Sequence, residues 1–242
     1  CDCQQNDLYI FSITTQEEAN MEILPIAHFE SPFPSKFGIP KQSGLVSELR
    51  GRIVFTREYR NRDALRGLEN FDYIWLIWEF SANKHKANSL VVRPPLLGGN
   101  TRMGVFATRS PFRPNNLGLS SVRIDSIDLD TTRGPIINVL GADLMDGTPI
   151  YDIKPYIVYA DSHPDVRNGF VDSTPIRRLK VVIPEQLATR LAPEQLSALR
   201  KTLELDPRPH YHDDATKVYG MPFCDMDIHF RVNGDTLYVI EV

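Results

Sequence analysis

The sequence predicts a mainly β protein, a single-sheet antiparallel β-barrel with a small α/β subdomain at its C-terminal end. Many short segments rich in β-branched and aromatic residues are separated by clusters of Gly, Pro and Asn, which is the pattern of strands and turns. Little helix stands between these segments, and no G-x-G-x-x-G follows any of them, so a doubly wound sheet is excluded. A closed barrel accommodates many short strands without leaving exposed edges.

The barrel strands are expected at 21–29, Gly51–Thr56, Tyr73–Phe80, Gly104–Thr108, Leu119–Asp130 and Ile136–Leu144. One short helix, RDALRGL, is expected between the second and third strands. Asn61 precedes it and is suited to cap it, and its apolar residues lie on one face.

The pattern changes in the C-terminal third of the chain. Leucines recur at helical spacing from Pro184 to Leu205, and Pro193 is expected to start a second helix, because proline cannot continue the first. Asn233-Gly234 predicts a hairpin between strands 226–232 and 236–242. We therefore divide the chain into an N-terminal extension (residues 1–20), a barrel domain (21–170) and a C-terminal α/β subdomain (171–242), with the boundary falling between residues 165 and 180.

Composition indicates an ordinary globular protein of 242 residues in a reducing compartment. The longest apolar run, Ile74–Trp78, is far shorter than the roughly 20 residues of a membrane helix. Three cysteines form no disulfide framework. Cys1-x-Cys3 and His210-x-His212 each resemble half of a metal site without a second half, so we predict no metal. We expect a cytoplasmic protein that does not contact a membrane.

The net charge of −4 argues mildly against nucleic acid as a partner, but local basic clusters offset this. Each cluster is about equally well explained as a solvated face or as a track for phosphates. The clusters are Arg50, Arg52, Arg57, Arg60, Arg62 and Arg66; Arg102, Arg109 and Arg113; and Arg177, Arg178 and Lys180.

Two segments carry the candidate chemistry. Residues 93–120, RPPLLGGNTRMGVFATRSPFRPNNLGLS, are loops of Pro, Gly, Asn and Arg around the short segment GVFAT, and such loops can read the edge of a nucleobase or merely turn barrel corners. Residues 143–156, DLMDGTPIYDIKPY, place Asp152, Lys154 and Tyr156 on one face of a strand. That face is either a solvated edge or a site.

These motifs resemble the TrmO family of tRNA (N6-threonylcarbamoyladenosine) N6-methyltransferases, also called the TsaA-like or VirR/YaeB family. The resemblance also rests on FGIPKQSGL (37–45), LRGLENFDYIWLIWEF (65–80) and DPRPHY (206–211). It implies a β-barrel methyltransferase that binds S-adenosylmethionine, acts on a tRNA anticodon loop and forms a homodimer.

Carried over from the family, the cofactor pocket is expected to gather residues from four loops. They are Lys41, Gln42, Ser43, Ser81, Ala82, Arg109, Leu119, Asp146, Gly147, Thr148 and Pro149. The family commonly has Arg and Pro where this chain has Lys41 and Ser43, and His-Gln at positions 81 and 82. Backbone contacts are expected to survive these differences.

Catalysis is expected to depend mainly on positioning, with a nearby group to accept the proton that the acceptor nitrogen loses. Asp152 is the candidate acceptor, beside Tyr156, and Asn115 is a weaker candidate for holding the acceptor. Asp152 is equally well explained by an ion pair with Lys154. The carboxylate of the threonylcarbamoyl group requires a cation, for which Arg113, Lys154 and Arg66 are candidates.

Two other interpretations fit the sequence. One is a methyltransferase of the same fold with a small molecule or a different RNA as acceptor. The other is a barrel that binds RNA without catalysis, in which the loops only contact phosphates. Binding of S-adenosylmethionine distinguishes the second, because a plain RNA-binding module does not need the cofactor.

Overall fold

A computed structural model describes residues 22–83, 89–208 and 214–242 of the chain. The predicted N-terminal extension, Cys1-x-Cys3, His210-x-His212 and the end of the DPRPHY motif lie outside the described residues.

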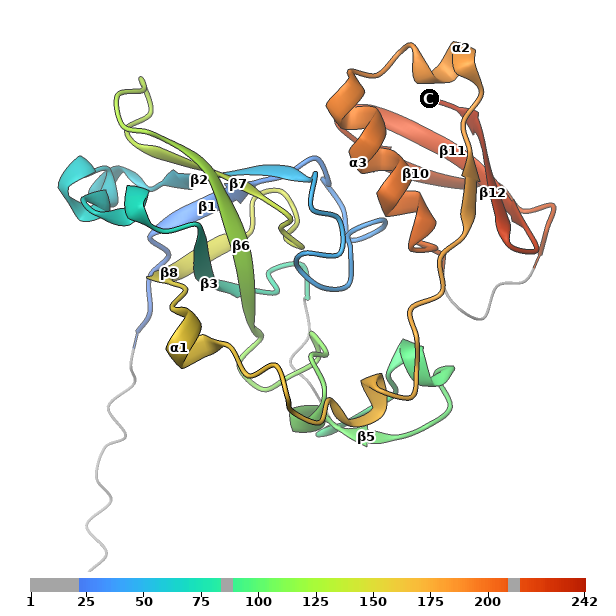
Figure 1. Ribbon diagram of the computed structural model, residues 1–242, viewed down its shortest axis with the longest axis horizontal. Coiled ribbons are helices and arrows are strands. Elements are labelled where there is room, and N and C mark those ends of the chain that lie inside the picture. The colour runs from blue at the N-terminus through green and yellow to red at the C-terminus, as the bar shows by residue number, and fades with distance from the viewer. Residues whose placement is uncertain (1–21, 84–88, 209–213) are drawn as a thin grey trace, which may run out of the picture.

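Six strands form a closed antiparallel barrel in the order β1-β2-β7-β6-β3-β8 (Figure 1). The strands are β1 Ala27–Glu30, β2 Arg50–Phe55, β3 Tyr73–Glu79, β6 Leu117–Asp128, β7 Ile136–Leu140 and β8 Pro149–Pro155. Pairing of β1 with β8, with Ala27 opposite Ile150, closes the sheet. The prediction of a mainly β fold is confirmed.

The barrel interior is filled by side chains that alternate along each strand. Ile74, Leu76 and Trp78 of β3 are buried, whereas the residues between them are only partly buried. Ile137 and Ile150 reach the same core from β7 and β8. Because the strand period is two, this alternation leaves Trp75 and Ile77 on the outer face.

Antiparallel pairing makes the connections alternate between the two ends of the barrel. The connections 31–49, 80–116 and 141–148 leave at one end, which we call the loop end. The connections 56–72 and 129–135 lie at the opposite end. This division decides which predicted residues can meet.

Several elements differ from the sequence prediction. GVFAT is not a strand: only Gly104 belongs to β5 (Met103–Gly104), which pairs with β4 (Val91–Val92), and a 3₁₀ turn follows at Val105–Ala107. The first strand begins at Ala27, two residues after a proline. RDALRGL forms a single 3₁₀ turn, Arg62–Leu65, that the Asn61 side chain caps by accepting the Asp63 N–H at 2.9 Å.

The C-terminal unit is a four-stranded sheet with helices on it, ordered β10-β11-β12-β9. Its elements are β9 Lys180–Val182, α2 Glu185–Ala188, α3 Pro193–Glu204, β10 Tyr219–Phe223, β11 Met226–Asn233 and β12 Thr236–Glu241. The remaining short elements are α1 Val158–Asp161 and 3₁₀ turns at Arg57–Tyr59, Leu68–Asn70, Pro95–Leu97 and Gly169–Val171. Pro193 starts α3 and Asn233–Gly234 ends β11, as predicted. Strands β9 and β10 were not anticipated.

The 31–49 connection belongs to both parts of the molecule. Phe33, Val46 and Leu49 are buried in the core of the C-terminal unit, together with Leu199 and Met221. On the barrel side, the backbones of residues 44 and 49 are hydrogen-bonded to Gly141, each at 2.8 Å. This connection therefore joins the C-terminal unit to the loop end.

We expect Gly51→Ala to lower the free energy of unfolding by about 1–3 kcal/mol, as overpacking a filled core does. A Cβ at Gly51 would stand 2.2 Å from the Phe29 ring, and Phe29 is itself buried in the barrel. Gly104→Ala is the matched control, because a Cβ there meets no atom within 4 Å. Urea unfolding measures both, and equal stability of the two variants would contradict the packing argument.

Candidate functional site

The loop end brings together the four segments predicted to hold the cofactor. Residues 41–43 lie in the first connection, 81–82 and Arg109 in the second, and 146–149 at the end of the third. Direct contacts join the first and second connections: Lys36 donates to the Asn83 side chain at 2.6 Å, and Asn83 donates to the Pro111 carbonyl at 2.9 Å. Residues far apart in sequence thus form one cluster of loops.

Gln42 and Arg109 are in direct contact within this cluster. The Arg109 guanidinium donates to the Gln42 side-chain oxygen at 2.5 Å, and the Gln42 amide donates to the Lys41 carbonyl at 2.6 Å. Burial lowers the pKa of Lys41, and the nearby Asp206 carboxylate opposes that shift. Asp206 thus brings the C-terminal unit to the edge of the cluster.

Asp143 lies beneath these loops, at the point where β7 has ended. The Trp78 indole N–H donates to Ser120 Oγ at 3.0 Å, and the Ser120 hydroxyl donates to Asp143 at 2.6 Å. Burial raises the pKa of the Asp143 carboxyl, whereas hydrogen bonds from Ser120 and from the Ser43 backbone, and the charge of Arg109, act against that rise. A single carboxylate thus links the barrel interior to two of the loops.

The Asp146–Pro149 turn is held against the first connection. The Asp146 carboxylate accepts the Ser31 N–H at 2.9 Å, and the Gly147 N–H donates to the Phe29 carbonyl at 2.8 Å. Gly147 has φ +74°, a conformation that favours glycine. Thr148 is buried and donates to the Met145 carbonyl at 2.7 Å. These hydrogen bonds hold the turn in place, and its exposed part is Asp146-Gly147.

The outer barrel face carries Leu119 and Asp152 on either side of Ile77. Ile77 of β3 is paired with Leu119 of β6 and with Asp152 of β8, so the three residues form one row across three strands. At a strand spacing of about 4.8 Å, the two outer residues of the row lie roughly 10 Å apart. This face joins a predicted cofactor contact to the predicted proton acceptor.

Asp152 has a partner on its own strand. Lys154 forms a 2.9 Å ion pair with it, and the Ile153 N–H donates to its other oxygen at 2.9 Å. Further along, the Tyr156 ring packs against Tyr73 and Trp75, with centroids 6.2 and 5.7 Å apart. The alternative role for Asp152, an ion pair with Lys154, is therefore present in the structure.

The remaining predicted residues are placed differently. Arg66 lies in the 56–72 connection at the opposite end of the barrel, exposed and paired with Asp63 at 2.5 Å, so the structure does not bring it to the loop end. The Arg113 guanidinium donates to the carbonyls of Thr108 and Ser110, each at 3.2 Å, and so braces its own loop. Asn115 is exposed in that loop.

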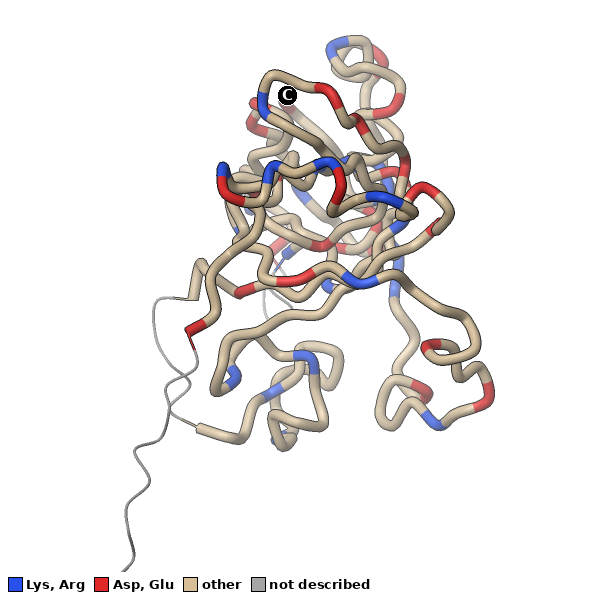
Figure 2. The backbone as a smooth tube through the Cα atoms, turned by 90° about the vertical axis from the view of Figure 1, so that its left-hand side faces the viewer, with Lys and Arg blue, Asp and Glu red and all other residues tan. Residues whose placement is uncertain are grey.

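The segment from Ser89 to Ile124 is strongly basic. It contains five arginines and no Asp or Glu. In Figure 2 the loop part of this segment shows Lys and Arg positions only, while both signs alternate over most of the rest of the backbone. The overall charge of −4 therefore hides a cationic loop at the loop end.

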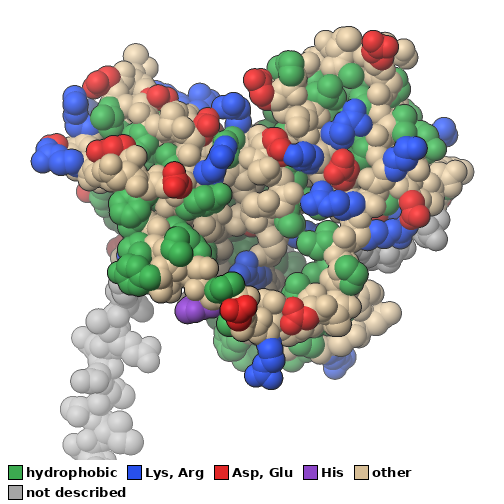
Figure 3. All heavy atoms as spheres, viewed as in Figure 1, with side chains coloured by type: hydrophobic (Ala, Val, Ile, Leu, Met, Phe, Trp, Pro, Cys, Tyr) green, Lys and Arg blue, Asp and Glu red, His purple; other side chains and the backbone are tan. Residues whose placement is uncertain are grey.

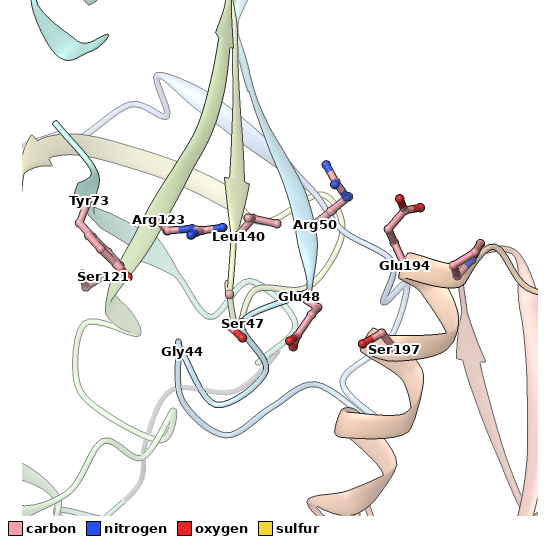
Figure 4. Close-up of a pocket in the computed structure, with 12 residues that line it drawn as sticks. Gly44, Ser47, Glu48, Arg50, Tyr73, Ser121, Arg123, Leu140, Glu194 and Ser197 are labelled. Atoms are coloured by element: carbon pink, nitrogen blue, oxygen red, sulfur yellow. The ribbon is translucent and has the colours of Figure 1, made fainter. Parts of the chain in front are cut away.

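A cleft of about 540 Å³ opens beside the loop end, between the barrel and α3 (Figure 4). It is lined by Arg50, Tyr73 and Arg123 from the barrel and by Glu194 and Ser197 from α3, among others. It contains none of the predicted site residues. Its charged groups are mixed in sign, and Arg50 is already paired with Asp125 at 2.9 Å.

Sequence reasoning missed two ionisable residues at this end, Asp143 and Tyr151. The Tyr151 hydroxyl donates to Glu79 at 2.5 Å; burial and then the Glu79 carboxylate raise the pKa of Tyr151 to about 12. Asp143 is the first residue of the 143–156 motif. Its hydrogen bond with Ser120, 23 residues away, is what indicates a role at the site. Nothing in the linear pattern could have indicated either contact.

Comparison with known proteins places the chain. Residues 28–162 match the profile of the tRNA-methyltransferase O N-terminal domain, and residues 176–242 match that of the TrmO C-terminal domain. The chain belongs to the TrmO family.

Named relatives cover nearly the whole chain. A tRNA (adenine(37)-N6)-methyltransferase of Escherichia coli (strain K12) is 37% identical over 89% of this chain and 96% of its own length. A putative S-adenosylmethionine-dependent methyltransferase, RcsF, of Pseudomonas aeruginosa is 37% identical over 91% of this chain and 96% of its own. The crystal structure of TrmO from Pseudomonas aeruginosa superposes with a TM-score of 0.74 at 30% identity, covering 91% of this chain and 97% of that one.

Two negative findings apply to the described part of this TrmO-family chain. Its helices are all too short or too polar to cross a membrane. Over the same residues, His, Cys, Asp and Glu side chains form no cluster of three or more that could hold a metal ion.

We expect Glu79→Gln to lower the pKa of Tyr151 from about 12 towards its ordinary value of 10, because the variant removes the carboxylate and leaves the burial. Since the folded-state pKa is raised, the contact contributes stability below about pH 10 that is lost as the pH rises through about 12. An NMR titration of labelled tyrosine carbons, assigned with Tyr151→Phe, measures the shift. An unchanged pKa would mean that burial alone causes it.

Proposed function

We propose that this TrmO-family protein transfers a methyl group from S-adenosylmethionine to N6 of threonylcarbamoyladenosine at tRNA position 37, next to the anticodon. The observation that carries the proposal is the full-length likeness to the Escherichia coli relative named as a tRNA (adenine(37)-N6)-methyltransferase. Both family profiles match, so the likeness includes the C-terminal unit.

The residues at the loop end suit S-adenosylmethionine, which carries a carboxylate, an ammonium, a sulfonium and an adenine. Arg109 supplies a guanidinium for the carboxylate, and the exposed Leu119 offers apolar surface. Backbone groups of residues 41–43, 81–82 and 146–149 complete the proposed pocket, so we expect the differences from the family at Lys41, Ser43, Ser81 and Ala82 to leave these contacts in place. When bound, the cofactor supplies an activated methyl group.

The chain's own task is to hold the acceptor nitrogen in line and to take its proton. Well-oriented reacting groups can gain up to roughly 7–11 kcal/mol over the reaction in solution. Asp152 is our proton acceptor: its carboxylate is held by Lys154 and the Ile153 N–H and shares a row with Leu119. Asn115, in the second connection, is proposed to hold the base. Tyr156 follows β8 at the end of the barrel opposite the loop end, where its N–H donates to the Tyr73 carbonyl at 2.9 Å, so it is not assigned to the same contact.

The basic loop is proposed to contact the anticodon loop of the tRNA, because phosphate contacts dominate nucleic-acid affinity. The carboxylate of the threonylcarbamoyl group is proposed to pair with Arg113, which lies in the second connection, or with Lys154, which is paired with Asp152 on β8. Arg66 is withdrawn from this role, since it lies at the opposite end of the barrel.

We further propose a homodimer in which the barrel domain (21–170) is catalytic and residues 171–242 support it. The outer face exposes Tyr73, Leu119, Val158 and Tyr159, and Figure 3 shows hydrophobic side chains gathered over the region of β3 and α1. Exposed apolar patches are typical of interfaces. Light scattering measures the mass of the protein in solution.

A tRNA substrate is consistent with an enzyme that works in the cytoplasm. The proposed reaction involves neither a metal nor a membrane.

Methylation of matched tRNAs tests the function. We expect methyl transfer to a tRNA that carries threonylcarbamoyladenosine and a rate lower by a factor of about 10⁴ or more on the same transcript with plain adenosine, because the cation that the bound acceptor desolvates then lacks its carboxylate. Single-turnover assays measure both rates. Equal rates would remove the threonylcarbamoyl group from recognition. If the protein binds RNA but not S-adenosylmethionine, a non-catalytic RNA-binding barrel is favoured. If it methylates another acceptor, a methyltransferase of the same fold with a different substrate is favoured.

Arg109→Ala is expected to weaken binding of S-adenosylmethionine by more than tenfold, since it removes the guanidinium proposed for the cofactor carboxylate. Arg102→Ala, an exposed arginine of the same loop, is the matched control and should bind normally. Calorimetry compares the dissociation constants. Unchanged affinity in a folded Arg109→Ala variant would exclude the residue from the pocket.

Asp152→Asn is expected to lower turnover by roughly 10²-fold or more while cofactor affinity stays within a few-fold, as when a proton acceptor is lost and binding is not. Asp125→Asn, another aspartate with a basic partner, is the control and should retain turnover. If Asp152→Asn keeps full activity, the carboxylate serves only its ion pair with Lys154.

A further inference from the structure

Asp143 interacts with three segments that are distant in sequence: two hydrogen-bond to it, and Arg109 acts on it at longer range through its charge. Ser120 reaches it from β6, the Ser43 backbone from the first connection, and the charge of Arg109 from the second. Ser120 is itself 2% exposed and accepts the Trp78 indole N–H, so the barrel side of the network is fixed.

A desolvated carboxylate is costly unless several donors and a cation compensate it. Burial alone would favour the neutral acid, as the raised pKa of Asp143 indicates, and the three partners oppose that effect. The dependence is mutual: once ionised, Asp143 attracts Arg109 and accepts from the Ser43 backbone. Arg109 in turn donates to Gln42.

We propose that Asp143 is a positioning residue for the cofactor, holding Ser43 and Arg109, and through Arg109 also Gln42, in the arrangement that binds S-adenosylmethionine. This proposal rests on the proposed function. Asp143 is partly buried beneath the loops and acts through these partners. The barrel core thereby sets the geometry of the loops, whose own backbones have few regular elements.

Asp143→Asn tests the charge with little change in volume. The amide cannot attract Arg109, so we expect the dissociation constant and the KM for S-adenosylmethionine to rise at least tenfold, while kcat at saturating cofactor changes less than threefold. Tyr151→Phe is the control: it removes a hydrogen bond at the same end of the barrel, to Glu79, and leaves every partner of Asp143 in place. It should lower stability but change cofactor affinity less than threefold.

A double-mutant cycle shows whether Asp143 acts through Arg109. Residues that act as one unit are not additive, so Asp143→Asn should weaken binding by less than about threefold in an Arg109→Ala background. Calorimetry on the full chain measures all four proteins, with thermal unfolding in parallel. Normal affinity in folded Asp143→Asn, or single effects that multiply in the double variant, would overturn the proposal.

Two further readouts separate the possible failures. If the wild-type chain does not bind S-adenosylmethionine, the proposed function fails; if it binds and Asp143→Asn binds equally, only this inference fails. Should Asp143→Asn not fold, wild-type affinity from about pH 7 to about pH 4 decides, since burial raises the pKa of Asp143 above the ordinary Asp value near 3.9. Arg109, the charged group that faces Asp143, stays charged throughout. Affinity that weakens towards the lower pH supports the proposal, and a flat profile overturns it.

Discussion

Closure of the barrel by β1 and β8 is the constraint on which the loop end depends. Ala27 pairs with Ile150, and every neighbour in the ring is antiparallel, so alternate connections must leave at the same end. The connections 31–49, 80–116 and 141–148 therefore meet at the loop end, and this follows from the strand order alone. For the same reason, the arginines of the 56–72 connection lie at the opposite end of the barrel, although they are close in sequence to β3.

The first connection is shared between two cores. Phe33, Val46 and Leu49 pack with the C-terminal unit, while Gly44 is hydrogen-bonded to Gly141 on the barrel. Lys41 lies between, close to the Asp206 carboxylate. The C-terminal unit thus stabilises one wall of the proposed pocket, which gives a physical reason for a subdomain that contributes none of the predicted site residues.

Charge at the loop end is organised locally. A loop without any acidic residue faces a single desolvated carboxylate, Asp143, and the rest of the surface carries both signs. Such an arrangement suits a partner that is anionic overall, with one fixed negative group to orient the arginine. The neutral Tyr151, whose pKa is about 12, adds a donor and not a base.

The sequence by itself determined the elements whose causes are local. Pro193 starts α3 because proline has no N–H to continue a helix, and Asn61 caps the turn that follows it. The predicted hairpin turns at Gly234, whose φ of +59° glycine adopts readily, while Asn233 is the last paired residue of β11. The motifs also indicated the family. Only the tertiary structure decided that GVFAT is a 3₁₀ turn, that Arg66 lies away from the loop end, and that Asp143 joins Ser43, Arg109 and Ser120. Those outcomes depend on strand order and on contacts between residues far apart in the chain, which no local pattern encodes.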